Sequence, residues 1–410
     1  MIGFRSKNAD RVDAPAGLVA SAFTAFMAVM SSSYAQTKGD DAAKQPFSTH
    51  SINTSTAVST PGGKASTPGV RASPATHPKP AIAHRRTSAT LIAAGTPCQT
   101  SAAPPAANAL GAYVGVVGDD NAAAQYQSFV SAMGSAPKML NGYVDPRFGE
   151  SEWVGNAQWS AGKMISASYA RPGNIIPVLG IPMAANGEDA GTSFRNIASG
   201  SEDAVFNGIF AAYANKGYKT IYIRPGWEMN GDWYPWSVTS ANAADFVAAF
   251  RRIADLAHNF PGATIKVIWN PAFRGFVDYN SIYPADQYVD MIGLDTYGVD
   301  AGGTPDSSVF DESSGPTDFS LKSALAMAIE NGKPLALPEV GAGTNDTTFP
   351  ANVATVIAAS SAQIAFVTLW DDPSGGNSSL YWSETPSTAA AWKKAFTAIA
   401  RLSGCSPSTP

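Results

Sequence analysis

A short segment of the sequence combines acidic, basic and aromatic side chains at unusual density. Residues 222–236 read YIRPGWEMNGDWYPW and include Glu228 and Arg224. Three of the chain's nine tryptophans also lie in it, namely Trp227, Trp233 and Trp236. A carboxyl group can donate or accept a proton in catalysis, and indole rings offer flat faces that pack against the apolar faces of sugar rings. The segment therefore indicates either tight aromatic packing or a functional site, and its place in the fold decides between them.

Histidine and cysteine chemistry are excluded by position. Three of the four histidines, His50, His77 and His84, lie in Ser/Thr/Pro-rich sequence, and His258 lies near the end of an expected helix. A Ser-His-Asp or Cys-His mechanism and a histidine-ligated zinc centre therefore lack their essential side chain. No spaced ligand loop for calcium stands out either, so we expect neither a metal ion nor a cofactor.

The first 108 residues differ in composition from the rest. Residues 1–35 have a positive start, an apolar run and small residues up to Ala35, which is typical of a signal peptide. Residues 36–108 are rich in Ser, Thr, Ala and Pro, which predicts a disordered linker. The apolar run is shorter than the ~20 residues of a membrane helix. We therefore expect a secreted or periplasmic protein with no stable membrane insertion.

The charges are divided unevenly along the chain. The linker carries seven Lys/Arg and two Asp/Glu, whereas residues 109–410 carry 17 Lys/Arg and 28 Asp/Glu. An acidic domain repels phosphate groups, so nucleic acid is not the expected ligand.

The two cysteines, Cys98 and Cys405, lie on either side of the expected folded domain, 109–405. In an exported chain this pattern predicts one disulfide that joins the two ends of the domain. We expect the protein to be a monomer.

Beyond residue 108, apolar β-type runs alternate with helix-like segments. The eight runs are 113–117, 139–144, 175–181, 220–225, 264–269, 289–297, 334–341 and 364–370. Strands that are apolar throughout and are followed by helices indicate a parallel sheet covered by helices. Eight such units favour a single (β/α)8 barrel, whose functional sites lie at the carboxyl ends of the strands.

Polar and aromatic side chains follow these expected strand ends. Glu228 follows the fourth run and Glu339 lies in the seventh. The candidate binding residues at the same ends are Arg224, Trp227, Asn230, Trp233, Trp236, Trp269, Asp295, Tyr297 and Trp370. Paired carboxyl groups with aromatic surfaces are what the cleavage of a glycosidic bond requires. A separation of about 5–5.5 Å between them would mean a retaining mechanism, and about 6.5–9.5 Å an inverting one.

Four motifs resemble glycoside hydrolase family 26, which includes β-1,4-mannanases, β-1,3-xylanases and some mixed-linkage β-glucanases. They are RPGWEMNGDWYPW, YPADQYVDMIGLDTYG, KPLALPEVG and LWDD, in this order along 109–403. The resemblance implies that Glu228 is the acid/base and Glu339 the nucleophile of a retaining mechanism. It also implies that Tyr297 binds the nucleophile and that Trp370 lies under the sugar at the cleavage point. Trp233 and Trp236 would line the neighbouring subsites.

Trp227 departs from the family, which usually has histidine before the acid/base. An indole has a single N–H and more bulk, so the specificity for mannan does not transfer automatically. Trp227, Trp233 and an ionised Glu339 would raise the pKa of Glu228, as an acid catalyst requires. Arg224 would order the nucleophile or form a buried structural ion pair.

We therefore predict a secreted endo-β-glycanase that acts on a polysaccharide. β-1,4-Mannan is the first choice of substrate, ahead of β-xylan, β-glucan or an exopolysaccharide of the same cell. The alternatives are a non-catalytic carbohydrate-binding barrel, an accessory protein of exopolysaccharide export and a transglycosylase.

Overall fold

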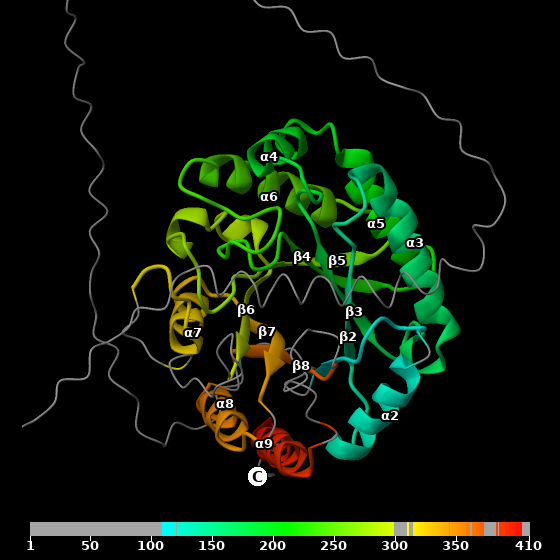
Figure 1. The fold of residues 1–410 in the computed structure, drawn as a ribbon, viewed down its shortest axis with the longest axis vertical. Coiled ribbons are helices and arrows are strands. Elements are labelled where there is room, and N and C mark those ends of the chain that lie inside the picture. Colours follow the sequence, from blue (N-terminus) through cyan, green and yellow to red (C-terminus); the bar gives the residue numbers. More distant parts are fainter. Residues whose placement is uncertain are drawn as a thin grey trace, which may run out of the picture. The chain divides into compact units, whose positions relative to one another are not determined.

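Eight parallel strands form a closed barrel, with helices around its outside (Figure 1). The structure, a computed structural model, describes residues 109–119, 121–298, 310, 315–343, 345–360, 363–372, 383 and 385–403. The strands follow one another around the barrel in chain order, and β8 pairs with β1. The predicted (β/α)8 barrel is therefore confirmed.

The strands agree closely with the apolar runs, apart from the first. Their bounds are β1 Ala109–Tyr113, β2 Met139–Tyr143, β3 Ile176–Ile181, β4 Thr220–Pro225, β5 Thr264–Trp269, β6 Met291–Tyr297, β7 Leu335–Gly341 and β8 Ile364–Trp370.

The helices lie between the strands in sequence. They are α2 Ala122–Met133, α3 Glu150–Ser166, α4 Ala190–Ser199, α5 Asp203–Ala214, α6 Ala243–His258, α7 Leu321–Glu330, α8 Thr348–Ala359 and α9 Pro386–Ser403. Three short 3-10 turns are η1 Ser168–Ala170, η2 Tyr279–Ile282 and η3 Asp286–Tyr288. The connection between β5 and β6, residues 270–290, contains only η2 and η3, so the expected helix is missing there.

Helix α6 shows why the covering helices form where they do. Its buried residues recur at intervals of three and four, at Phe246, Ala249, Phe250, Ile253, Ala254 and Ala257. This spacing places them on one face of an α-helix, which packs against the barrel while the charged residues face outward. Helix α4 is capped at its start by Asp189, whose carboxylate accepts a hydrogen bond from the backbone N–H of Thr192.

The first strand lies earlier than predicted. The sequence predicts a strand at 113–117, but β1 ends at Tyr113, where it pairs with Trp370 of β8. Gly115 and Gly118 have φ angles of 82° and 95°, which interrupt an extended backbone. Two of the valines that suggested a strand, Val114 and Val117, are buried in the core beyond the end of β1.

The amino-terminal half of the barrel interior is filled by apolar side chains. They come from strands β2, β3 and β5 to β8, and they are Met139, Val178, Ile268, Met291, Ala336, Ala365 and Phe366. Ile176 and Tyr222 pack against this cluster, and the Tyr222 ring stacks on Phe366. We call it the apolar layer.

Several predictions concern residues outside the described ranges. The signal peptide, the linker and the disulfide between Cys98 and Cys405 all lie there. Among the described helices, none has the length and apolar character needed to cross a membrane.

Candidate active site

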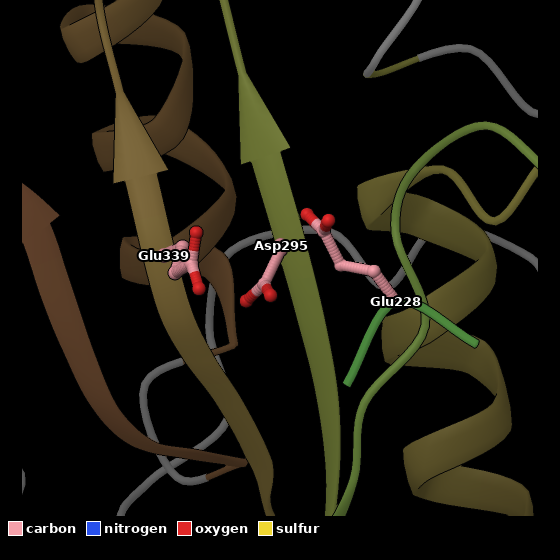
Figure 2. A group of neighbouring side chains, drawn as sticks. All are labelled: Glu228, Asp295 and Glu339. Carbon is pink, nitrogen blue, oxygen red and sulfur yellow. The ribbon is translucent and has the colours of Figure 1, made fainter. Parts of the chain in front are cut away.

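Three carboxyl groups converge at the carboxyl end of the barrel (Figure 2). Glu339 lies within β7, Asp295 lies within β6, and Glu228 lies three residues beyond the end of β4. One carboxyl oxygen from each lies within 4.8 Å of the other two. This upper limit on the oxygen–oxygen distances is compatible with the carboxyl spacing of retaining glycosidases.

Arg224 of β4 neutralises charge within this group. Its guanidinium is completely buried and donates from Nη1 to Oδ2 of Asp295, at 2.9 Å. Both Nη1 and Nη2 also donate to Oε1 of Glu339, each at 2.9 Å. Of the two roles expected for Arg224, the structure combines both, because the buried ion pair itself orders Glu339.

Two tyrosines hold Glu339 from opposite sides. Tyr297 donates to Oε2 at 2.6 Å, which is the hydrogen bond that the resemblance implies. Tyr143, at the end of β2, donates to Oε1 at 2.7 Å. Burial, followed by the charge of Glu339, raises the pKa of both phenols well above its usual value, so each remains a donor. Oε1 therefore receives three donors and Oε2 only one, which leaves Oε2 the better placed oxygen for attack on a substrate.

Tyr143 was missed by the sequence analysis, and its position depends on Gly180. Gly180 of β3 pairs with Tyr143 on one side and with Arg224 on the other. A Cβ at position 180 would lie 2.6 Å from the Tyr143 ring and 3.0 Å from the Trp227 ring. Without a side chain there, the Arg224 guanidinium lies 5.2 Å from the centroid of the Tyr143 ring. The signal available in the sequence was the place of Tyr143 at the end of a predicted strand.

Glu228 lies in a strained turn. Its φ angle is 55°, in the left-handed region, and Gly226 has a φ of 56°. For a residue other than glycine this conformation costs about 1–3 kcal/mol and persists only where surrounding contacts hold it. Glu228 is held by its backbone N–H, which donates to the carbonyl of Asn270 at 2.7 Å, and by Trp233, whose Nε1 donates to Oε2 at 2.8 Å.

Burial is the main cause of an unusual proton affinity at Glu228. Burial and then the charge of Glu339 raise the pKa of Glu228 to about 8, against smaller opposing effects of Trp233 and Arg224. Burial and Glu339 likewise raise the pKa of Asp295 well above its usual value, although Arg224 lies beside it. Glu228 therefore suits the role of proton donor at neutral pH.

The three carboxyl groups are also close enough to share a metal ion. Arg224, however, already lies against two of them and supplies the positive charge that a cation would bring.

Two of the predicted tryptophans belong to the core. Trp236 and Trp269 are fully buried, and their indole N–H groups donate to the backbone carbonyls of Trp227 and Ile282. Their assignment to substrate subsites is therefore corrected, because no face of either ring is open to a sugar.

The other tryptophans lie closer to the carboxyl groups. Trp227 is largely buried against Tyr143 and Tyr234. Trp370 is as fully buried as Trp236 and Trp269, and it packs against Tyr113 with ring centroids 4.1 Å apart, so its predicted place under the sugar is corrected on the same ground. Trp233 is partly exposed. The aromatic segment at 222–236 is thus partly core and partly site.

Asn230 is a structural residue. Its Nδ2 donates to the carbonyl of Ala272 at 2.9 Å, and its Oδ1 accepts from the N–H of Ala272 at 2.8 Å. The side chain is fully buried, which corrects its prediction as a substrate ligand. It joins the loop after β4 to the loop after β5.

Comparisons with known proteins agree with this geometry. Residues 211–315, which include Glu228 and Asp295, match the model of glycosyl hydrolase family 26. A mannan endo-1,4-beta-mannosidase of Bifidobacterium adolescentis is 30% identical over 193 residues, which cover 43% of this chain and 19% of that protein. Endoglucanase H of Acetivibrio thermocellus is 33% identical over 110 residues, which cover 25% of this chain and 12% of that protein. The chain thus spans less than a fifth of the length of either relative.

Solved structures with a similar fold share little sequence. The YdhT protein of Bacillus subtilis has a TM-score of 0.49 and 18% identity, over 69% of this chain and 84% of that one. The catalytic domain of a family 26 endo-β-1,4-mannanase from Bacillus sp. JAMB-750 has a TM-score of 0.48 and 18% identity, over 70% and 86%. The family match, which includes the turn around Glu228, confirms that this chain resembles glycosyl hydrolase family 26.

Proposed function

We propose that this protein is a retaining endo-β-glycanase that cleaves a β-linked polysaccharide, with β-1,4-mannan as the first choice of substrate. The observation that carries the proposal is the pair Glu228 and Glu339, whose carboxyl oxygens lie within 4.8 Å in a buried site. The family match and the mannanase and endoglucanase relatives support the class of substrate.

The reaction would begin with a protonated Glu228 and an ionised Glu339. Oε2 of Glu339 attacks the anomeric carbon while Glu228 gives its proton to the glycosidic oxygen, and the bond from that oxygen to the anomeric carbon breaks. The products of this step are a covalent glycosyl ester on Glu339 and the released sugar chain. Glu228, now ionised, takes a proton from water, which attacks the anomeric carbon and releases Glu339.

The surrounding residues prepare the two carboxyl groups for these roles. Arg224 and Tyr143 fix Oε1 of Glu339, so that Oε2 faces the substrate with Tyr297 beside it. Burial keeps Glu228 protonated before the first step, and its charge after that step is stabilised by the Trp233 N–H. These donors are in place before the substrate binds, which is the arrangement that lowers a reaction barrier most effectively.

The place of action is part of the same proposal. The composition of residues 1–35 supports export, so we place the enzyme outside the cytoplasm, in the periplasm or the medium. Outside the cytoplasm, the enzyme would have access to a polysaccharide that is too large to cross a membrane. We propose a monomer that meets its substrate without a partner protein.

A screen of purified polysaccharides tests the proposal. The full chain is mixed with β-1,4-mannan, β-xylan and mixed-linkage β-glucan, and new reducing ends are measured with product sizes. Cleavage of one of them, lost in Glu339→Ala, supports the proposal. Binding without cleavage would instead favour a non-catalytic carbohydrate-binding barrel, and larger products than the substrate would favour transglycosylation.

A second measurement tests the acid. Glu228→Gln is expected to cleave polysaccharide slowly, and to lose much less activity on aryl glycosides whose leaving groups need no proton. Equal losses on both kinds of substrate would contradict the acid role of Glu228.

A further inference from the structure

Two large apolar side chains are exposed in the described part of the chain, and they lie at opposite ends of the barrel. Phe276 is 62% exposed and follows β5, at the carboxyl end where the carboxyl groups converge. Ile329 is 57% exposed and lies near the end of α7, shortly before β7 begins. Only Phe276 is therefore on the same end of the barrel as Glu228.

Phe276 is fixed to the loop that carries Glu228. Its backbone N–H donates to the carbonyl of Asn230 at 2.7 Å, and the Asn230 side chain binds the backbone of Ala272. Gly275 lies so close to Asn230 that a Cβ there would be 2.4 Å from Nδ2. Asn230 is two positions beyond Glu228, so their Cα atoms are at most about 7 Å apart. The backbone of Phe276 therefore has a defined position beside the acid.

The position of Phe276 corresponds to the leaving-group side of the site. Glu228 approaches from the loop after β4, on the far side of Asp295 from Glu339 (Figure 2). Tyr143 binds Glu339 and packs near Trp370 on the other side, so we assign that side to the sugar that becomes bonded to Glu339. Since Glu228 gives its proton to the departing oxygen, the departing sugars extend past the β4 and β5 loops.

We propose that Phe276 forms a subsite for a sugar ring on the leaving-group side of the bond that is cleaved. The ligand is the same β-linked glycan, and this inference rests on the proposed function. Trp233 is partly exposed and hydrogen-bonded to Glu228, and it would contact the first departing sugar. Phe276 would contact a sugar ring beyond that one. An exposed phenyl face packs on the apolar face of a pyranose, and the contact removes both from water.

The test compares Phe276→Ala with Ile329→Ala, which removes the other exposed apolar side chain. Activity is measured on mannohexaose, xylohexaose or a mixed-linkage gluco-hexasaccharide, chosen by the screen, and on an aryl β-glycoside of the same sugar. Phe276→Ala is expected to lower the ratio of the two kcat/KM values about tenfold, equivalent to about 1.4 kcal/mol. The size is typical of an aromatic contact. Phe276→Trp restores the ratio, and Ile329→Ala leaves it unchanged.

Product sizes give an independent readout. Without the subsite, hexasaccharide binds in other registers, so the released fragments on the leaving side become shorter in Phe276→Ala only. If Phe276→Ala and Ile329→Ala gave the same ratio and the same products, the subsite would be refuted while the hydrolase stands.

Binding to an inactive variant separates this inference from the proposed function. Calorimetry with the same hexasaccharides is done on Glu339→Ala, with and without Phe276→Ala. If the wild type cleaves nothing but binding still weakens about tenfold with Phe276→Ala, the subsite stands and the hydrolase falls. If no hexasaccharide is either bound or cleaved, both proposals are overturned.

Discussion

The two halves of the barrel interior are built on opposite principles. The amino-terminal half contains the apolar layer, in which Phe366 stacks on Tyr222. The carboxyl-terminal half contains Arg224 and three carboxyl groups, all of them buried. Burial stabilises the first half and costs free energy in the second, where only pairing and hydrogen bonds offset it. The same closed barrel thus stabilises itself at one end and holds reactive groups at the other.

Backbone strain is also present at the carboxyl end. Glu228, with its φ of 55°, lies in the turn after β4, at the end of the barrel that holds the buried charges. Strain and buried charge in the same place are typical of functional sites, which lose stability relative to the rest of the fold. Substitutions at the carboxyl end are therefore expected to lower activity more than stability, and substitutions in the apolar layer to lower stability more than activity.

The largest expected effect is on activity at the carboxyl end. Glu339→Ala removes the proposed nucleophile and should lower kcat by about 10⁴-fold or more on a substrate found by the screen. Folding, followed by circular dichroism, should change little. Glu330→Ala, an exposed glutamate at the end of α7, is the matched control and should retain full activity. Comparable kcat values in Glu339→Ala and Glu330→Ala would contradict the proposed role of Glu339.

The reverse separation is expected in the apolar layer. Phe366→Ala leaves a cavity between strands and should lower the free energy of unfolding by about 3–5 kcal/mol. The kcat of the folded protein, measured well below the midpoint of thermal unfolding, should remain close to that of the wild type. Denaturant unfolding and kinetics on the same preparation check both. A large fall in kcat without a loss of stability would show that the two halves are coupled.

A smaller loss of kcat is expected when Tyr143 loses the hydroxyl group that donates to Glu339. Tyr143→Phe removes one donor from Oε1 of Glu339 and should lower kcat about tenfold to a hundredfold, the range of a hydrogen bond to a charged group. KM should change little. Tyr213→Phe is the control, since Tyr213 is also buried and donates to Ser160 away from the site. If both variants lost kcat equally, the role of Tyr143 would be structural only.

The smallest effect concerns pH and stability. The pKa of Glu228 is raised to about 8, so the folded state binds a proton between pH 4.5 and 8 that the unfolded state releases. This contribution is fully present below the unfolded pKa and is lost as the pH rises through the folded one. Glu228→Gln should therefore be more stable than the wild type at pH 8. The difference should shrink toward pH 5 in urea titrations, and the opposite trend would contradict the raised pKa.

The barrel could be predicted because its strands are apolar along their whole length. Seven of the eight runs end within a residue of the observed strand ends, so the strand that carries each of Glu228, Asp295 and Glu339 followed from the sequence. The first strand was misplaced because 113–117 is richer in valine than ALGAY, the segment that forms β1. Pairing with β8, which involves residues far apart in the chain, decides its position.

The directions of the side chains could not be predicted in the same way. Trp236 and Trp233 are three residues apart, yet one is in the core and the other contacts Glu228. Irregular turns have no fixed period, so the sequence does not state which face a residue in them presents. Tyr143 contacts Glu339 across 196 positions of sequence, and nothing local identifies that contact.

Gly180 of β3 restricts which side chains can occupy two neighbouring positions, Tyr143 of β2 and Trp227 after β4. Any larger residue there would displace the rings of Tyr143 and Trp227 together. Relatives with alanine or a bulkier residue at this position are therefore expected to have smaller side chains at both neighbouring positions. We therefore expect positions 143, 180 and 227 to change together during evolution. A reconstructed ancestor with only one of these changes would have poorly packed side chains beside Glu339.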